Sequence, residues 1–318
     1  MQAAASDLDI DLDIYESDVS DRFARVTAAV DRLTTEPLPD AAVFSVEFGQ
    51  ALPLMNAAEQ SKIPFFLNGP LFPEELLELG EKPGQKYRYW HGYFLEDEEM
   101  KGYLLAKKLI AAARDSNNNG QDSRTVHVAG INGNRSWYGS ILREAGLRRA
   151  IEEDPDALLL QMVYTRWTPE EGRSMAYQLL RRYPEISVIW AASDQLALGA
   201  AEALANPRSD NVQVYIGGLD LSGAGIDSVL RGELRATVAS TNLIWAQVIV
   251  DLHDHLQGLN ITGHIDSVFT HQSIVAEPST AENIRKNIRN FDMIDFRHFS
   301  RFHYGTAARR LSDLMEEL

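Results

Sequence analysis

The sequence predicts an α/β protein with two lobes, each built on a parallel sheet with helices on its faces. Short apolar stretches of strand length alternate with amphipathic stretches of helical length, and this alternation is typical of parallel sheets. The chain has 318 residues, more than the roughly 250–300 at which a single hydrophobic core usually divides. Together the two observations favour two lobes over one.

The first third of the chain begins the alternation. Residues 10–15 alternate apolar with acidic side chains, which predicts a strand, and residues 20–33 carry apolar side chains at helical spacing. The next predicted elements are a strand at 41–46, a helix at 51–61 and a strand at 63–67 that Asn68-Gly69-Pro70 ends. A loop is predicted over 72–89, followed by a long amphipathic helix at 98–113.

The same rhythm repeats in the rest of the chain. Strands are predicted at 125–129, 157–163, 188–192, 212–216, 236–239 and 268–274, and helices at 136–152, 169–182, 194–205, 224–231 and 243–256. Residues 291–318 are predicted to be a tail whose aromatic side chains dock against a lobe.

Composition excludes several classes of function. The net charge is −16, from 46 acidic and 30 basic residues, which disfavours binding to nucleic acid. The chain has no cysteine, so disulfides, thiolate nucleophiles and cysteine metal sites are excluded. No apolar run is long enough for a membrane-spanning helix, which predicts no direct insertion into a membrane. His253 and His255 would point to different faces of a helix, so no metal site or cofactor is expected.

Two motifs carry a resemblance to a known family. Residues 183–204 read YPEISVIWAASDQLALGAAEAL, and residues 214–220, VYIGGLD, precede GELRATV at 232–238. At this spacing the chain resembles the type I periplasmic binding proteins, such as the ribose- and galactose-binding proteins, over most of its length. The resemblance implies two Rossmann-like lobes joined by a three-strand hinge near residues 94–98, 239–243 and 269–275.

The resemblance also implies how the chain is divided. The N-terminal lobe would comprise residues 1–95 and 241–271, and the C-terminal lobe 96–240 and 272–285, with a tail at 286–318. Met1-Gln2-Ala3-Ala4-Ala5 is similar to the end of the family's first helix. We therefore expect the N-terminal lobe to be incomplete, lacking its first strand and most of its first helix, and the chain alone to be unstable because sheet edges stay unpaired.

Three ligand-binding residues are implied at the start of the cleft. Asn68 lies where the first lobe offers a side chain to ligand hydroxyls, and Arg143 matches an arginine on the first helix of the second lobe. Trp167 matches an aromatic position after that lobe's second strand, where an indole face suits a sugar ring. Trp137, Trp90 and Tyr138 are weaker candidates.

Four more ligand-binding residues are implied by the two motifs. Ser193 and Asp194 occupy the positions of the family's Asn-Asp pair, and Asp220 occupies the position of the aspartate in its Phe-Asp motif. Ser240 occupies the last polar position before the chain returns to the first lobe. Ser193 and Ser240 are shorter than the family's amide side chains, which leaves the specific sugar open. Asp194 has a second interpretation as the cap of the helix that follows it.

The resemblance implies a non-enzymatic function. We expect a periplasmic protein that captures a sugar or sugar-like solute between its lobes and delivers it to an ABC permease. One alternative is a receptor for a signalling molecule coupled to a membrane sensor kinase. Another is the effector-binding core of a lactose-repressor-type regulator, which the acidic charge disfavours.

Overall fold

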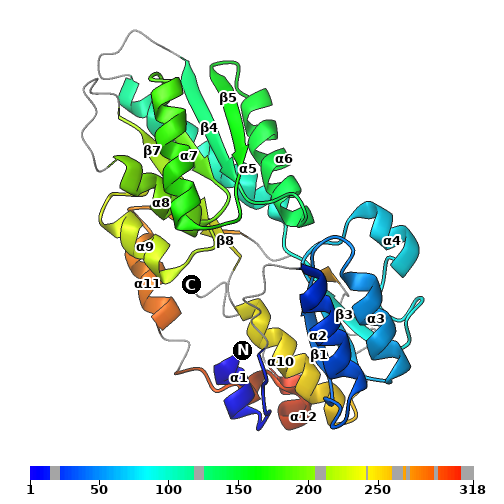
Figure 1. Cartoon of the computed structure of the whole chain (residues 1–318). Coiled ribbons are helices and arrows are strands. Elements are labelled where there is room, and N and C mark those ends of the chain that lie inside the picture. The colour runs from blue at the N-terminus through cyan, green and yellow to red at the C-terminus, as the bar shows by residue number, and fades with distance from the viewer. Residues whose placement is uncertain are drawn as a thin grey trace.

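The structure is a computed structural model that describes residues 1–14, 22–117, 125–204, 213–240, 243–259, 268–269, 273–289 and 293–308. It has two lobes, each with its own sheet, and the predicted fold class is confirmed (Figure 1). We call them the first lobe, built on the four-stranded sheet β1-β2-β3-β9, and the second lobe, built on the six-stranded sheet β10-β8-β7-β6-β4-β5.

The first lobe's sheet is parallel throughout. Its strands are β1 (Ala42–Ser45), β2 (Phe65–Asn68), β3 (Trp90–Phe94) and β9 (Val268–Phe269). A buried cluster that includes Phe44, Phe65 and Met55 packs this sheet against helices on one face. The helices of this part are α2 (Arg22–Thr34), α3 (Ala51–Gln60) and α4 (Pro73–Leu79), and α4 lies inside the segment predicted as a loop.

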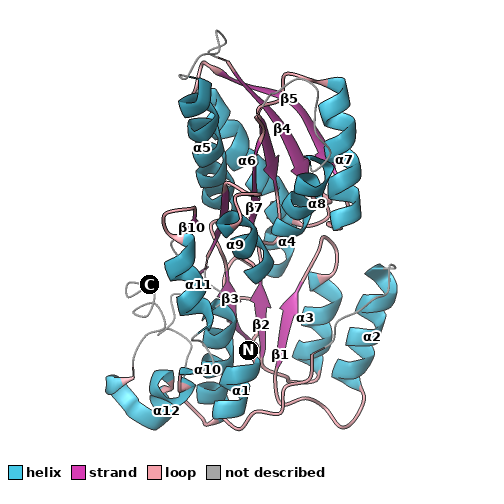
Figure 2. Cartoon of the chain, turned by 90° about the vertical axis from the view of Figure 1, so that its left-hand side faces the viewer, coloured by secondary structure: helices cyan, strands magenta, loops and turns pink. Residues whose placement is uncertain are grey.

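Helix α10 (Leu243–Leu256) covers the opposite face of the first sheet through Val248 and Leu252, which contact Phe66 and Phe94. Its outer side carries a further layer, made of α1 (Gln2–Asp7) and the C-terminal elements η2 (Phe296–Phe299), α12 (Arg301–Tyr304) and η3 (Gly305–Ala307). Figure 2 shows α1 and α12 at the base of the first lobe. Of the tail aromatics expected to dock, Phe296 and Phe299 are buried in this layer, whereas Phe302 is 49% exposed.

The strand predicted over residues 10–15 is wrong for the part that the structure describes. Residues 10–14 form no regular element, and residue 15 lies outside the described residues. Helix α1 ends just before them, where the Ile10 amide donates to the Ala5 carbonyl at 2.9 Å. Ile10 and Leu12 then pack against the cluster of α1 and α10. The apolar side chains of the alternating pattern pack on helices and not in a sheet, so the segment forms no strand.

The second sheet has five parallel strands and one antiparallel edge strand. The parallel strands are β4 (Val126–Asn132), β5 (Ala157–Tyr164), β6 (Val188–Ala191), β7 (Tyr215–Leu219) and β8 (Ala236–Ala239). Strand β10 (Ile274–Ala276) runs antiparallel to β8, which corrects the expectation of a wholly parallel sheet. Helices α5 (Glu98–Asn117) and α6 (Tyr138–Glu152) cover one face, and α7 (Pro169–Arg182), α8 (Asp194–Leu204), α9 (Gly223–Leu230) and α11 (Ala281–Arg289) the other.

The chain passes between the two sheets three times. It leaves the first sheet after β3, returns from β8 to α10, and crosses again between β9 and β10. These crossings are the expected hinge, although residues 241–242 and 270–272 lie outside the described part. The predicted strand over 268–274 is divided accordingly into β9 and β10. No helix among the described residues is long and apolar enough to cross a membrane.

Candidate ligand-binding cleft

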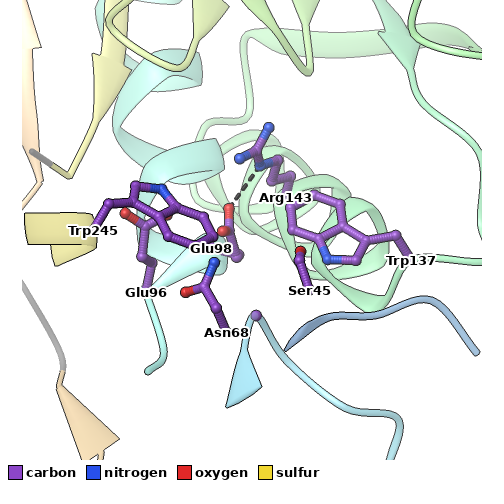
Figure 3. A pocket seen from close by; sticks show the side chains of 8 residues that line it. Ser45, Asn68, Glu96, Glu98, Trp137, Arg143 and Trp245 are labelled. Atoms are coloured by element: carbon purple, nitrogen blue, oxygen red, sulfur yellow. Dashed lines mark hydrogen bonds and ion pairs between the residues drawn. The ribbon is translucent and has the colours of Figure 1, made fainter. Parts of the chain in front are cut away.

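A cleft of about 210 Å³ lies where the two lobes face each other. Both lobes contribute to its wall (Figure 3), which is formed by Ser45, Asn68, Gly69, Glu96, Glu98, Trp137, Arg143 and Trp245. The cleft is smaller than the roughly 300–1,000 Å³ of pockets for drug-sized ligands, so it suits a compact solute.

The first lobe's polar residues come from the carboxyl ends of neighbouring parallel strands. Ser45 ends β1 and Asn68 ends β2, and the two residues are directly paired in the sheet register. The next residue, Gly69, has a φ of +91°, which a side chain would strain. Its amide donates to the Phe94 carbonyl at 3.0 Å. The turn therefore holds Asn68 at the sheet edge, where open α/β sheets bind ligands.

Arg143 forms the second lobe's side of the cleft. Its side chain is buried, and its Nε donates to Glu98 Oε2 at 2.6 Å. Its Nη1 donates to the Ala192 carbonyl at 2.6 Å and to Asp220 Oδ1 at 3.3 Å. The guanidinium also lies 4.9 Å from the ring centre of Trp137, within the range of a cation–π contact. These partners fix Arg143 before any ligand arrives.

A close approach of two helices places Arg143 next to Glu98. A Cβ on Gly102 of α5 would lie 2.0 Å from the Arg143 carbonyl oxygen, and one on Gly146 of α6 would lie 2.0 Å from the Glu99 carbonyl oxygen. Only glycine permits this separation of the backbones. The two glycines therefore let the N-terminal part of α5 pack closely against the middle of α6 beneath the cleft.

A buried chain of charges connects Arg143 to the first crossing. Lys101 Nζ lies 2.9 Å from Glu98 Oε1 and 2.5 Å from Glu96 Oε2, and the Lys101 and Glu98 side chains are 1% and 3% exposed. Burial by itself raises the pKa of Glu98, but Arg143 and Lys101 together hold that pKa below its usual value. Glu98 is therefore a carboxylate at neutral pH.

Two tryptophans stand on opposite sides of the polar groups. Trp137 precedes α6 in the second lobe, and Trp245 lies in the first turn of α10 in the first lobe. Figure 3 shows their rings on either side of Asn68 and Glu98. The slot between them thus has apolar faces at its sides and hydrogen-bonding groups around its edge, an arrangement suited to a sugar ring.

The predicted residues divide into two groups. Asn68 and Arg143 line the cleft, and Asp220 is ion-paired to Arg143 with 42% of its side chain exposed. Trp167 is not among the lining residues. It packs edge-on behind Trp137, with ring centres 5.9 Å apart, and so supports the cleft wall from behind.

Ser193, Asp194 and Ser240 lie in the second lobe beneath the cleft wall and are all buried. Ser193 Oγ, not Asp194, accepts from a backbone amide of α8, that of Leu196 at 3.2 Å. Asp194 Oδ2 accepts from the Ser222 amide at 2.8 Å and from the Ser222 hydroxyl at 2.7 Å, which anchors the loop that carries Asp220. Burial raises the pKa of Asp194 to about 7. None of the three is among the residues that line the cleft, and Ser193 and Asp194 bond instead to the backbone and side chains of the second lobe.

Sequence reasoning missed several lining residues. Glu96 and Glu98 lie in an acidic stretch that resembles any helix N-terminus, and Trp245 lies on a helix whose apolar pattern fits a core. Trp137 was only a weaker candidate. No local pattern distinguishes these residues, because their shared position depends on how the two lobes meet.

The lobes touch directly beside the cleft. The Phe48 amide donates to the Ser136 carbonyl at 2.7 Å, and the Ser136 hydroxyl donates to Glu47 Oε2 at 2.7 Å. The rings of Phe72 and Tyr138 also meet, with centres 4.9 Å apart. These contacts join parts of the chain that belong to different lobes, so the two lobes touch directly on this side of the cleft.

The comparison with known families matches this architecture. A family model described as a periplasmic binding protein domain matches residues 1–259. The chain belongs to this family. A crystal structure of a periplasmic sugar-binding protein from Pseudomonas fluorescens is 26% identical, covers 98% of this chain and 90% of its own, and has a TM-score of 0.81.

Two further relatives are more distant. The D-apiose import binding protein of Paraburkholderia graminis is 25% identical over 142 residues, which are 44% of this chain and 45% of that protein. The match thus spans about half the length of this curated relative. A periplasmic solute-binding protein from Actinobacillus succinogenes with bound D-allose shares the fold, with a TM-score of 0.70 at 23% identity over 89% of this chain and 92% of its own.

No group of three or more metal-ligating side chains occurs within the described ranges. The charged groups of the cleft are instead paired with one another, as in the Glu98–Arg143 and Lys101–Glu96 contacts. The site is thus built to accept and donate hydrogen bonds.

Proposed function

We propose that this chain captures one monosaccharide-sized sugar in the cleft between its lobes. The observation that carries the proposal is the pair of indoles, Trp137 and Trp245, placed by different lobes on either side of polar groups. A sugar ring has apolar C–H faces and a rim of hydroxyls, so it complements this slot. A ligand that touches both lobes stabilises their closed arrangement, because it binds the open form less well.

The relatives support a role in import. Those with functional names are import binding proteins for apiose and ribose, and several similar structures hold monosaccharides such as D-allose. We propose that this protein acts in the periplasm and delivers its sugar to an ABC permease without catalysing a reaction. We also propose the lobe boundaries given above, with residues 1–95 and 241–271 in the first lobe. None of these relatives favours the sensor-kinase or the repressor alternative.

The direct test is calorimetric titration of the full chain with D-ribose, D-allose, L-arabinose, D-galactose and D-apiose. We expect at least one sugar to bind and to raise the melting temperature, since a ligand that binds only the folded state stabilises it. Trp245→Ala should weaken that binding by about tenfold or more, as truncation of a buried aromatic contact does.

Tyr177→Ala is a matched control, because Tyr177 is an exposed aromatic of α7 outside the cleft. Its sugar affinity should equal that of the unmodified chain. Failure of every sugar to bind would contradict the proposed function, and equal binding by the Trp245 and Tyr177 variants would contradict the assigned slot.

A further inference from the structure

The charged groups at the cleft do not balance. Three carboxylates, those of Glu96, Glu98 and Asp220, are linked by ion pairs to two cations, Lys101 and Arg143, which leaves one negative charge in excess. Glu47 adds a further carboxylate at the nearby contact between the lobes. Because the cleft is partly shielded from water, this excess acts on a ligand more strongly than an exposed charge would.

Both cations at the cleft already have carboxylate partners. Arg143 already pairs with Glu98 at 2.6 Å and with Asp220 at 3.3 Å. Lys101 is 1% exposed and lies between Glu98 and Glu96. A ligand carboxylate that displaced Glu98 from Arg143 would take away a buried partner, which is costly, and one that left both partners in place would add a third negative charge beside Arg143.

Glu96 is the carboxylate of this network that both lines the cleft and lies at its edge. Its side chain is 24% exposed, and the ion pair with Lys101 engages Oε2. Glu96 lies on the crossing between β3 and α5, so it faces the slot from the hinge side. A carboxylate there can accept a hydrogen bond from a hydroxyl or an ammonium group, but it repels another carboxylate.

We propose that Glu96 is a specificity-determining residue, which makes the cleft accept neutral and amino monosaccharides and reject the corresponding sugar acids. The inference rests on the proposed sugar-binding function and deepens it. Amino sugars gain in addition from the two indole faces, since a cation near a tryptophan ring is attracted to it.

The test compares sugars that keep the ring and differ in one charged substituent. The full chain is titrated with D-galactose, D-galactosamine and D-galacturonate, with the corresponding glucose series, and with D-ribose and D-riburonate. In each series that binds, the acid should bind at least about tenfold more weakly than the neutral sugar. In Glu96→Gln, which keeps the size of the side chain, this ratio should fall to below about threefold.

The ratio of two affinities is measured on the same folded molecules, so a partial loss of stability in Glu96→Gln does not affect it. Glu99→Gln is the matched control, because Glu99 pairs with Arg149 outside the cleft and its removal should leave the ratio unchanged. Equal affinity for neutral and acidic sugars in the unmodified chain, or an unchanged ratio in Glu96→Gln, would overturn the proposed role of Glu96. Either result would leave the proposed sugar-binding function standing. Binding of no sugar in any series would overturn the proposed function, and this inference with it.

Discussion

Glu98, the first residue of α5, and Arg143, in the second turn of α6, form a buried ion pair with 2.6 Å between Glu98 Oε2 and Arg143 Nε. Both side chains are less than a tenth exposed, so neither charge has water as an alternative partner. Removing one member of a buried pair costs about 3–5 kcal/mol when the other charge is left uncompensated, and here Asp220 stays as a more distant partner of Arg143, at 3.3 Å, so the lower end of that range applies. We expect Glu98→Gln to lower the free energy of unfolding in urea by about 3 kcal/mol.

Glu99→Gln provides the comparison within the same helix. Glu99 pairs with Arg149 at 2.5 Å, but both side chains are more than a third exposed, and exposed pairs contribute about 0–1 kcal/mol. A loss of equal size in the two variants would show that the Glu98–Arg143 pair has no special weight.

Gly102→Ala is expected to damage the site although Gly102 itself does not line the cleft. The new methyl group would lie 2.0 Å from the Arg143 carbonyl oxygen, so α5 and α6 must move apart. We expect a loss of about 2 kcal/mol or more in unfolding free energy, as for other overpacked positions, and weaker sugar binding. Gly223→Ala is the control, because its nearest neighbour is the tip of Arg285 at 3.4 Å and should yield. Equal stability of the two variants would contradict the close-packing argument.

Much of the fold follows from the sequence because strand and helix periodicity are local properties. The buried strand at Val188–Ala191 and the helix after it were predicted to within a residue, and so was Asn68 at the end of a strand. The strand predicted over residues 10–15 failed because its alternation of apolar and acidic residues also suits an irregular segment lying on a helical layer. Only tertiary packing decides between the two outcomes.

The candidate site was only partly predictable for a related reason. Asn68 and Arg143 follow from the resemblance, whereas Trp245 and Glu96 reach the cleft only because α10 and the first crossing bring them there. Asp194 matches the family motif, yet its hydrogen bonds to Ser222 give it a framework role. A motif identifies which residue of the chain corresponds to a family position. What the side chain of that residue contacts depends on its surroundings in the folded protein.

Asp251 should make stability depend on pH. This carboxyl group of α10 is buried, and burial raises its pKa from 3.8 to about 8. Because the folded pKa lies above the unfolded one, the folded state binds more protons between those two values. The contribution of Asp251 to the free energy of unfolding should therefore be largest below about pH 4. It should fall as the pH rises toward 8.

The corresponding variant is Asp251→Asn, which keeps a hydrogen-bonding partner for Gln247 at 2.8 Å but cannot ionise. We expect its melting temperature to drop less between pH 5 and pH 8 than that of the unmodified chain. Asp194 also lowers the stability of the folded state as the pH rises to about 7. Asp251→Asn should therefore reduce the slope of melting temperature against pH without abolishing it. An identical profile in the variant would show that Asp251 titrates normally.

The contact between the lobes at Ser136 should set how readily the cleft closes. The Ser136 hydroxyl shares its proton between Glu47 Oε2 at 2.7 Å and Asn134 Oδ1 at 2.6 Å, and a net hydrogen bond contributes about 0.5–1.5 kcal/mol. Ser136→Ala should therefore shift the equilibrium toward the open form by roughly two- to tenfold. If the sugar binds the closed form alone, its dissociation constant rises by a similar factor once the closed form becomes the minor species.

Small-angle scattering on the sugar-free protein measures the first effect, as a larger radius of gyration in Ser136→Ala. Titration with the bound sugar measures the second. Thr34→Ala is the control, since the Thr34 hydroxyl donates to the Val30 carbonyl of its own helix at 2.8 Å and spans no interface. Ser136 is not among the residues that line the cleft. Weaker sugar binding together with a larger radius of gyration would therefore show that the substitution acts on the closure of the lobes. Weaker binding at an unchanged radius would instead show that it acts on the site itself.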